Sequence, residues 1–226
     1  MNLLPKTFAL ALTLCLFATS TTAFAQFVST ADRGTIRSDG ITNVIGNMSF
    51  FTGVEAVGAD PLLDFRSWFL FDVPNLPTES FLTATLELEN PNGGIEVLNS
   101  ALDLTVFEFQ GDVANLVSGS NGLSNYFDLG IGTVFGQTTI NEVDFRSGGT
   151  VEIELNAAGV NALNLAEGNQ IAFGLSLAPT TPDNHIFGFT NETFSTGFSF
   201  ETIPEPVSGT LLTLGLVAGI AYRRRK

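Results

Sequence analysis

Few residues in this chain are of the types that carry hydrolytic chemistry. His185 is the only histidine, and a serine–histidine–acid hydrolase would use it as the base. No Gly-x-Ser-x-Gly segment, which would place a serine nucleophile, occurs in the sequence. We therefore expect His185 to occupy an exposed loop or a strand edge and to have no catalytic role.

Closely spaced carboxylates suggest a second chemistry, the hydrolysis of glycosidic bonds. A glycosidase needs one protonated and one ionised carboxyl group at a defined separation. The pairs Glu87/Glu89 and Glu152/Glu154 are each two residues apart, so each pair lies on one face of a strand, opposite its apolar residues. A solvated outer face is the favoured interpretation. A secreted carbohydrate-active enzyme that uses paired carboxylates is the alternative.

Metal binding is limited by the scarcity of nitrogen and sulfur ligands. A zinc site needs several histidine or cysteine ligands, and the only cysteine is Cys15, near the N-terminus. Calcium prefers oxygen ligands, which Asp60, Asp64 and Asp183 offer in predicted loops. We expect no cofactor other than calcium, for which these three aspartates are the candidate ligands.

Aromatic side chains are the remaining candidates for ligand contact, because sugar-binding sites commonly combine a flat aromatic face with polar groups. Trp68 is the only tryptophan, and it lies in the most hydrophobic segment, which favours a place in the core. Tyr126 follows a glycine-rich segment, residues 119–125, and is the better candidate for an exposed aromatic. Trp68 and Tyr126 are therefore the two candidate ligand contacts.

The elements that position these candidate residues are short runs in which the polarity of the side chains alternates. Apolar and polar residues alternate, and Gly, Asn, Asp or Pro separate the runs, as is typical of half-buried β-strands. The runs are residues 48–54, 80–89, 101–109, 151–155, 171–177, 186–189 and 198–203. Residues 65–71 are apolar on both faces at the end of the run, which predicts a central strand that is covered on each side.

One helix interrupts this pattern. Asn156 is a predicted N-cap, residues 157–166 form the helix, and Gly168 ends it. Two packed antiparallel sheets are the natural way to bury alternating strands in this number. The sequence therefore predicts an all-β fold over residues 26–202, a single antiparallel β-sandwich of jelly-roll type with one short helix.

The first 25 residues have the order of a secretory signal peptide. Lys6 precedes an apolar run, residues 7–17, that is too short to span a bilayer, and a small-x-small site follows at Ala23 and Ala25. We expect signal peptidase to cut before Gln26, so residues 1–25 form a removable signal helix. A buried N-terminal helix is the alternative.

Residues 203–226 combine three features in a fixed order. Pro204, Glu205 and Pro206 come first, and an apolar run of about 16 residues follows, slightly short for a membrane span. The basic residues at the end stay on the cytoplasmic side of the membrane. They are Arg223, Arg224, Arg225 and Lys226. The segment predicts a C-terminal transmembrane helix that holds the chain at the membrane before processing.

This tail resembles the PEP-CTERM sorting signal of diderm bacteria, over residues 203–226. The resemblance implies that a membrane exosortase cuts the chain near Pro204, Glu205 and Pro206, in cells that produce exopolysaccharide. An ordinary C-terminal anchor, and hence a membrane-anchored surface protein, is the alternative.

The middle region resembles the DNRLRE-type sandwich modules of secreted bacterial proteins. The resemblance is carried by Arg-Ser, an apolar strand, Phe-Asp and Leu-Pro within residues 66–77, followed by the Ala-Thr-Leu strand of residues 82–88. It implies an adhesion or carbohydrate-associated module rather than a catalyst.

Charge limits the partners of the mature protein. All 23 acidic residues lie between Gln26 and Pro206, whereas the only basic residues there are Arg33, Arg37, Arg66 and Arg146. Such a surface repels phosphate backbones, so we expect no nucleic acid partner and no anionic membrane surface, but divalent cations and neutral polysaccharide suit it.

These observations favour an exported, non-enzymatic protein that is sorted by an exosortase. We expect signal peptidase and the exosortase as its partners during export, with exopolysaccharide as a candidate partner afterwards. The membrane is contacted only through the C-terminal helix before processing. The mature protein is expected at the cell surface or outside the cell.

Overall fold

The computed structural model describes residues 26–43, 50–55, 62–89, 95–97, 101–141, 149–178, 184–188 and 196–204. The predicted signal helix and transmembrane helix lie outside these residues. Within them, no helix is long and apolar enough to cross a bilayer.

Thirteen strands and three helices make up the described chain. The strands are β1 (Gln26–Ser29), β2 (Asp32–Arg37), β3 (Thr42–Asn43), β4 (Phe50–Glu55), β5 (Leu63–Asp72), β6 (Glu79–Glu89), β7 (Ile95–Val97), β8 (Leu102–Glu108), β9 (Val134–Ile140), β10 (Thr150–Glu154), β11 (Gln170–Ala178), β12 (Asn184–Gly188) and β13 (Gly197–Pro204). The helices are α2 (Val113–Ser118), α3 (Gly122–Asp128) and α4 (Ala157–Leu165).

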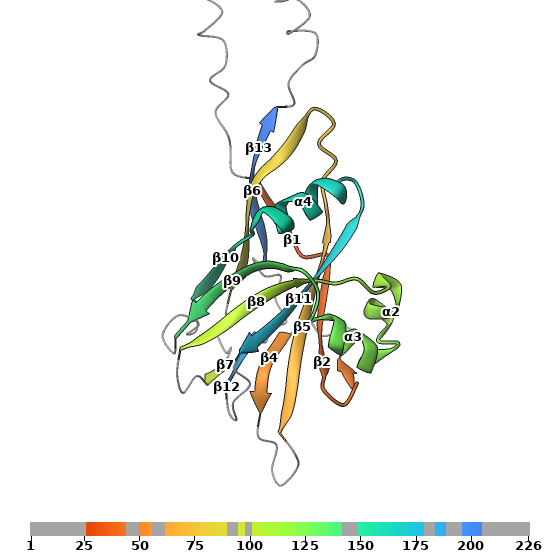
Figure 1. Cartoon of the computed structure of the whole chain (residues 1–226), viewed down its shortest axis with the longest axis vertical. Coiled ribbons are helices and arrows are strands. Elements are labelled where there is room, and N and C mark those ends of the chain that lie inside the picture. The colour runs from red at the N-terminus through yellow and green to blue at the C-terminus, as the bar shows by residue number, and fades with distance from the viewer. Residues whose placement is uncertain are drawn as a thin grey trace, which may run out of the picture.

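The strands form two antiparallel sheets, which confirms the predicted all-β class (Figure 1). We name the four-stranded sheet, with the order β1-β13-β6-β10, sheet A. The nine-stranded sheet B has the order β7-β12-β4-β5-β11-β8-β9, with β2 pairing with β5 and β3. The two sheets meet at one corner, where Gly136 of β9 bridges Leu155, the residue after β10.

The main core fills the space between the two sheets, as the alternation predicted. On β6, Phe81, Ala84, Leu86 and Leu88 are buried, and the residues between them lie at or near the surface. Phe173 of β11 is fully buried between strands β5 and β8. Full burial of each such side chain contributes about 1.5–3 kcal/mol to the free energy of unfolding.

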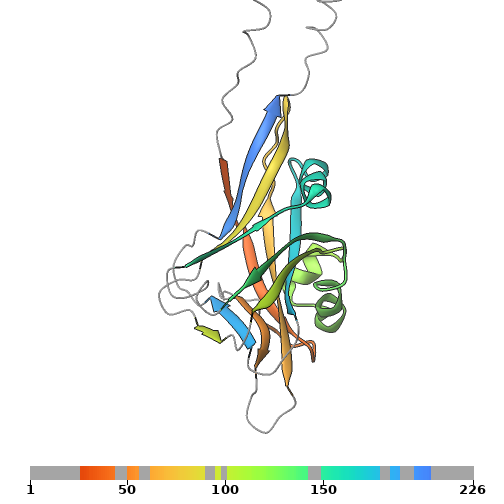
Figure 2. The same ribbon diagram turned by 60° about the vertical axis from the view of Figure 1, so that its left-hand side comes forward.

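Strand β5 is buried on both faces, which confirms the prediction for residues 65–71. Phe69 and Phe71 point into the main core, whereas Trp68 and Leu70 belong to a second core on the opposite face of sheet B. Helices α2 and α3 cover this second core, and Figure 2 shows them on one flank of the molecule. Gly174 of β11 allows the C-terminal end of α3 to approach sheet B closely. A Cβ at this position would lie only 2.5 Å from the carbonyl oxygen of Leu129, the residue after α3.

Helix α4 confirms the predicted helix and its cap. The Asn156 side chain accepts hydrogen bonds from the backbone N–H groups of Ala158 and Gly159, as an N-cap residue should. The Asn164 side chain accepts from Phe81 N at 2.8 Å and donates to Phe81 O at 3.2 Å, which ties α4 to β6.

The prediction of a single short helix is wrong, because α2 and α3 are also present. Both are short, of six and seven residues, so neither shows the apolar periodicity that identifies a helix in a sequence. Asp112 caps α2, and Gly119 ends it in the left-handed conformation. Of the glycine-rich segment, residues 119–121 connect α2 to α3, and residues 122–125 form the first turn of α3.

Candidate functional site

The two predicted processing points lie at the same end of sheet A. Gln26, the residue after the predicted signal cleavage site, is the first residue of β1 and pairs with Phe200 of β13. Pro204 is the last residue of β13 and pairs with Glu79, the first residue of β6. Gln26 and Pro204 are therefore about 13 Å apart along the sheet. Figure 1 shows the end of β13 beside the start of β6.

The other residues of the predicted processing sites lie outside the described chain. They are Ala23, Ala25, Glu205, Pro206, Arg223, Arg224, Arg225 and Lys226. Their assignment to signal cleavage, sorting and cytoplasmic anchoring stays a prediction. We name the described part of this region, Gln26 with residues 201–204 and Glu79, the terminal pole.

Tyr126 is buried, so the prediction that it is exposed is wrong. Only 5% of its surface is accessible, because α3 turns the ring onto sheet B. The Tyr126 hydroxyl donates a hydrogen bond to Asp64 Oδ2, and the Arg66 guanidinium lies over the ring at 4.3 Å from its centroid. Trp68 lies in the same second core and has no accessible surface, in agreement with its predicted core position.

Arg66 completes a cluster with Asp64 and Tyr126 that the sequence did not indicate. Its Nη1 donates to the carbonyl oxygens of Tyr126 and Phe127, at 2.9 and 3.1 Å, and its Nε lies 3.8 Å from Asp64 Oδ2. Both carbonyl groups belong to the last turn of α3. A cation is favourable at the C-terminal end of a helix, where carbonyl groups are left without intrahelical partners. The cluster joins β5 to α3 and accounts for the polar side chains at the start of β5.

The cluster perturbs two pKa values. Burial raises the pKa of Asp64, and the hydrogen bond from Tyr126 and the charge of Arg66 offset part of that rise. Burial, followed by the hydrogen bond to Asp64, raises the pKa of Tyr126. Tyr126 is therefore protonated at neutral pH and acts as a hydrogen-bond donor.

Asp64→Asn is expected to change how stability depends on pH. Because the folded-state pKa of Asp64 is raised, its contribution to stability is full below the unfolded-state pKa of about 3.9 and is lost as the pH rises through the folded-state pKa. Asparagine keeps an acceptor for Tyr126 but does not ionise. Urea denaturation should show the variant gaining stability relative to wild type from about pH 3 to about pH 7.

Asp39→Asn is the matched control for this measurement. The hydrogen bond from Arg37 lowers the pKa of Asp39, so this carboxyl contributes stability above its unfolded-state pKa and loses it as the pH falls. The Asp39→Asn variant should therefore show the opposite trend with pH. A loss of relative stability in Asp64→Asn at rising pH would contradict the assigned direction for Asp64.

The candidate calcium ligands are only partly described. Asp60 and Asp183 lie outside the described residues, and the Asp64 carboxylate accepts the hydrogen bond from Tyr126. Across the described chain, no three His, Cys, Asp or Glu side chains are grouped so that they could hold a metal ion. The calcium site stays a prediction.

His185 is neither in a loop nor at a strand edge, so that prediction is wrong. It lies in β12, which pairs with β4 on one side and β7 on the other. Its ring stacks on Phe51 with centroids 4.6 Å apart, and only 9% of its surface is accessible. The tertiary pairing of β12, which alternation alone does not show, places this histidine inside the protein.

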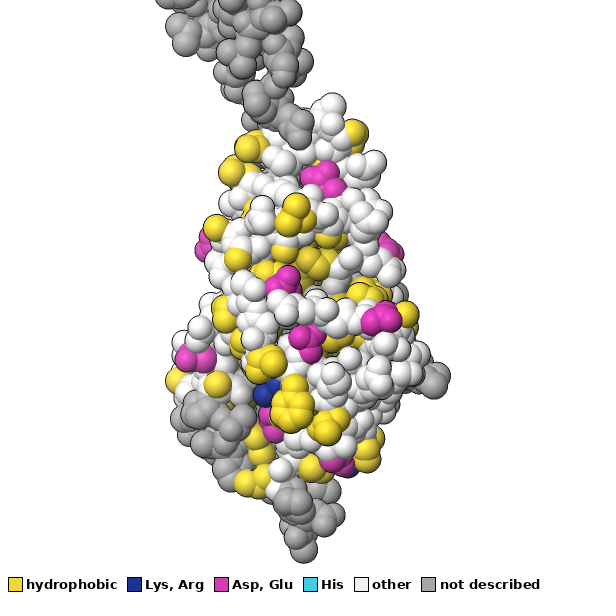
Figure 3. Space-filling model, turned by 45° about the vertical axis from the view of Figure 1, so that its right-hand side comes forward, with side chains coloured by type: hydrophobic (Ala, Val, Ile, Leu, Met, Phe, Trp, Pro, Cys, Tyr) yellow, Lys and Arg dark blue, Asp and Glu magenta, His cyan; other side chains and the backbone are white. Residues whose placement is uncertain are grey.

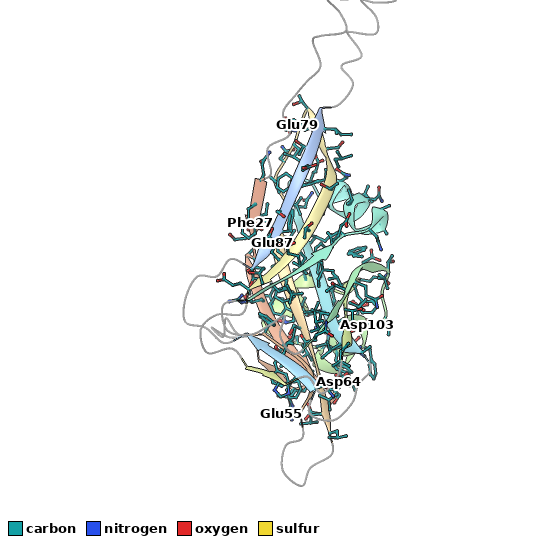
Figure 4. All side chains as sticks on the ribbon, turned by 90° about the vertical axis from the view of Figure 1, so that its left-hand side faces the viewer. Phe27, Glu55, Asp64, Glu79, Glu87 and Asp103 are labelled. Atoms are coloured by element: carbon teal, nitrogen blue, oxygen red, sulfur yellow. The ribbon has the colours of Figure 1, made fainter. Side chains whose placement is uncertain are left out.

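The paired carboxylates lie on the outer face of sheet A, as predicted. Glu87 and Glu152 occupy directly opposed positions on β6 and β10, next to buried leucine, valine and isoleucine residues. Like charges in such positions repel each other across the strands. Figure 4 shows Glu87 on the same flank as Phe27, with the other labelled acidic residues spread along the molecule.

Two exposed aromatic rings replace the buried Trp68 and Tyr126 as candidates for ligand contact. Phe27 of β1 is 44% accessible, and its ring lies against Gly197 of the neighbouring strand. Phe127 of α3 is 51% accessible and lines a shallow hollow with Gln110 and Asp128. Figure 3 shows the helix-bearing face, where apolar side chains are interspersed with single acidic residues.

No protein-family model and no curated protein matches the sequence of this chain.

Proposed function

We propose that this chain is the precursor of an exported, non-enzymatic protein that an exosortase sorts to the cell surface or the exopolysaccharide matrix. The body is a β-sandwich, for which we propose the jelly-roll type. The observation that carries the proposal is the ordered tail: strand β13 ends at Pro204, the first residue of the motif, and Glu205, Pro206, an apolar run and four basic residues follow in the sequence.

The terminal pole supports this proposal. A protein that is held by its C-terminal helix and cut near Pro204 needs a body that is complete without the tail. The described strands begin at Gln26 and end at Pro204, and the core residues of β13, Phe198 and Phe200, precede the motif. The folded body can therefore keep its core after both predicted cuts.

The acidic surface supports a partner without phosphate groups. Glu87, Glu152 and Glu201 lie on sheet A. The described basic side chains are buried or paired with a carboxylate: Arg33 is buried, Arg37 pairs with Asp39 at the surface, and Arg66 pairs with Asp64. A neutral polysaccharide would approach such a surface without electrostatic cost, whereas nucleic acid would be repelled. Adhesion to the matrix, with Phe27 or Phe127 as ligand contact, is the role that we propose for the body.

The opposed carboxylates provide a direct test against the enzymatic alternative. We expect the purified protein to bind exopolysaccharide from its host and to release no reducing sugar. Glu87→Gln and Glu152→Gln should leave binding unchanged within about twofold and should raise stability by up to about 1 kcal/mol, because the like-charge repulsion is removed.

The matched control for these variants is Glu167→Gln, which changes a glutamate in the turn after α4, outside the strands of sheet A. Sugar release by the wild-type protein that disappears in Glu87→Gln or Glu152→Gln, but persists in Glu167→Gln, would contradict the non-enzymatic proposal. It would instead establish a glycosidase that uses the opposed pair.

A further inference from the structure

Strand β13 remains part of sheet A up to the sorting motif itself. Its last residues pair with β6 in the register Thr202 to Phe81, Ile203 to Ser80 and Pro204 to Glu79. Glu205 and Pro206 follow directly in the sequence. No spacer therefore separates the end of the sheet from the motif at which the proposed cut takes place.

The end of β13 is held less firmly than the rest of the strand. Phe198 and Phe200 are buried in the main core, whereas Glu201 is exposed and Ile203 is 44% accessible. Strand β1 pairs with β13 only as far as Phe200, so residues 201–204 have β6 as their one partner strand among the described residues. Short segments with few buried apolar contacts open more readily than a core strand.

Two local features mark the point at which this end could separate. The register shifts between Glu201 and Thr202, so that the pairing with β6 passes over Leu82. Beyond the shift, the Thr202 hydroxyl donates a hydrogen bond of 2.6 Å to Glu79 Oε2. Thr202 and Glu79 therefore form a side-chain tie across the last pairs of the strand.

A processing enzyme that binds residues 202–204 as an added strand would need the main-chain groups that now pair with β6. Enzymes that bind peptide segments as added strands make hydrogen bonds along an extended main chain. We propose that residues 202–204 belong to the segment that the processing peptidase binds, and that they separate from β6 before the tail is cut. The inference rests on the proposed function. The terminal pole must then open before the C-terminal tail is removed.

A disulfide across the last pairs tests this requirement. Ser80 and Ile203 are directly opposed, and opposed residues in antiparallel strands have Cα atoms about 4.5–5.5 Å apart, within the range that a disulfide bridges. Cys15, the chain's only cysteine, precedes Gln26 and leaves with the predicted signal peptide. The double variant Ser80→Cys/Ile203→Cys would therefore carry a unique bridge in the exported protein.

The measurement is the rate at which the tail is lost in pulse–chase experiments on the full chain, in a host that produces an exosortase. We expect the oxidised double variant to be processed at least about tenfold more slowly than either single variant, and a membrane-permeant reductant to restore the rate. Thermal melts of all variants check that the body remains folded.

A second variant tests the tie between Thr202 and Glu79. Thr202→Val keeps the β-branched shape and removes the hydrogen bond, so processing should be about two- to tenfold faster. Thr150→Val, at an exposed position on β10 whose partner is Glu89 at the other end of β6, is the matched control and should not alter the rate.

Equal processing rates for the oxidised double variant and its single-cysteine controls would overturn the inference, because the peptidase would then act on a paired strand. That result would leave the proposed function intact. A wild-type chain that keeps its tail in the exosortase-producing host would overturn the proposed function, and the inference with it.

Discussion

Replacing Phe173 by alanine is expected to lower the free energy of unfolding by about 3–5 kcal/mol. Phe173 has no accessible surface, and its ring lies 5.2 Å from that of Phe71 and 5.5 Å from that of Phe135, measured between centroids. Truncation would remove buried apolar area and leave a cavity beside the rings of Phe71 on β5 and Phe135 on β9. Strand β11 pairs with both β5 and β8 at this point, so the backbone can collapse little into the space.

Chemical denaturation measures this loss, and thermal melts should show a fall in Tm of roughly 6–20 °C. Ile131→Ala is the control, because Ile131 is 71% exposed and its truncation should change stability by less than about 0.5 kcal/mol. A loss below about 1 kcal/mol for Phe173→Ala would mean that the space between the sheets is not a single packed core.

The second large effect concerns the tail. Changing Pro204, Glu205 and Pro206 together to alanine is expected to abolish C-terminal processing, because the three residues form the proposed recognition motif. The body should still fold, since the buried residues of β13 are Phe198 and Phe200, upstream of the motif. Immunoblots of pulse-labelled cells would show the uncut form persisting in the membrane fraction.

Pro74→Ala/Pro77→Ala is the matched control, because it changes prolines in the connection between β5 and β6 and leaves the tail intact. Its processing should follow wild type. Wild-type rates for the triple-alanine variant, or equal tail loss in hosts with and without an exosortase, would rule out sorting through this motif.

Local patterns in the sequence were sufficient to predict much of the sheet structure. Alternation on β6 and β10 identified the buried face, because a strand with one solvated side repeats every two residues. The run ending at Phe71 identified a strand covered on both faces. Asn156 identified the start of α4, because an N-cap acts through its own side chain on the next few backbone N–H groups.

The second core could not be predicted, because it depends on tertiary packing. Helices α2 and α3 are too short to show a periodic apolar face, and they are stabilised by Trp68 and Leu70 from a distant strand. Tyr126 appeared exposed because it follows a glycine-rich segment, yet its partners Asp64 and Arg66 lie about 60 residues away in the sequence. His185 was misplaced for the same reason, since the pairing of β12 with two other strands is a long-range property.

We propose that both hydrophobic ends are removed from a folded, acidic β-sheet body. Intact mass spectrometry of the protein recovered from outside exosortase-producing cells tests it most directly. We expect a single species that begins at Gln26 and ends within or next to the segment formed by Pro204, Glu205 and Pro206. Recovery of the folded protein from the cytosol with Met1 and Lys226 still in place would contradict it.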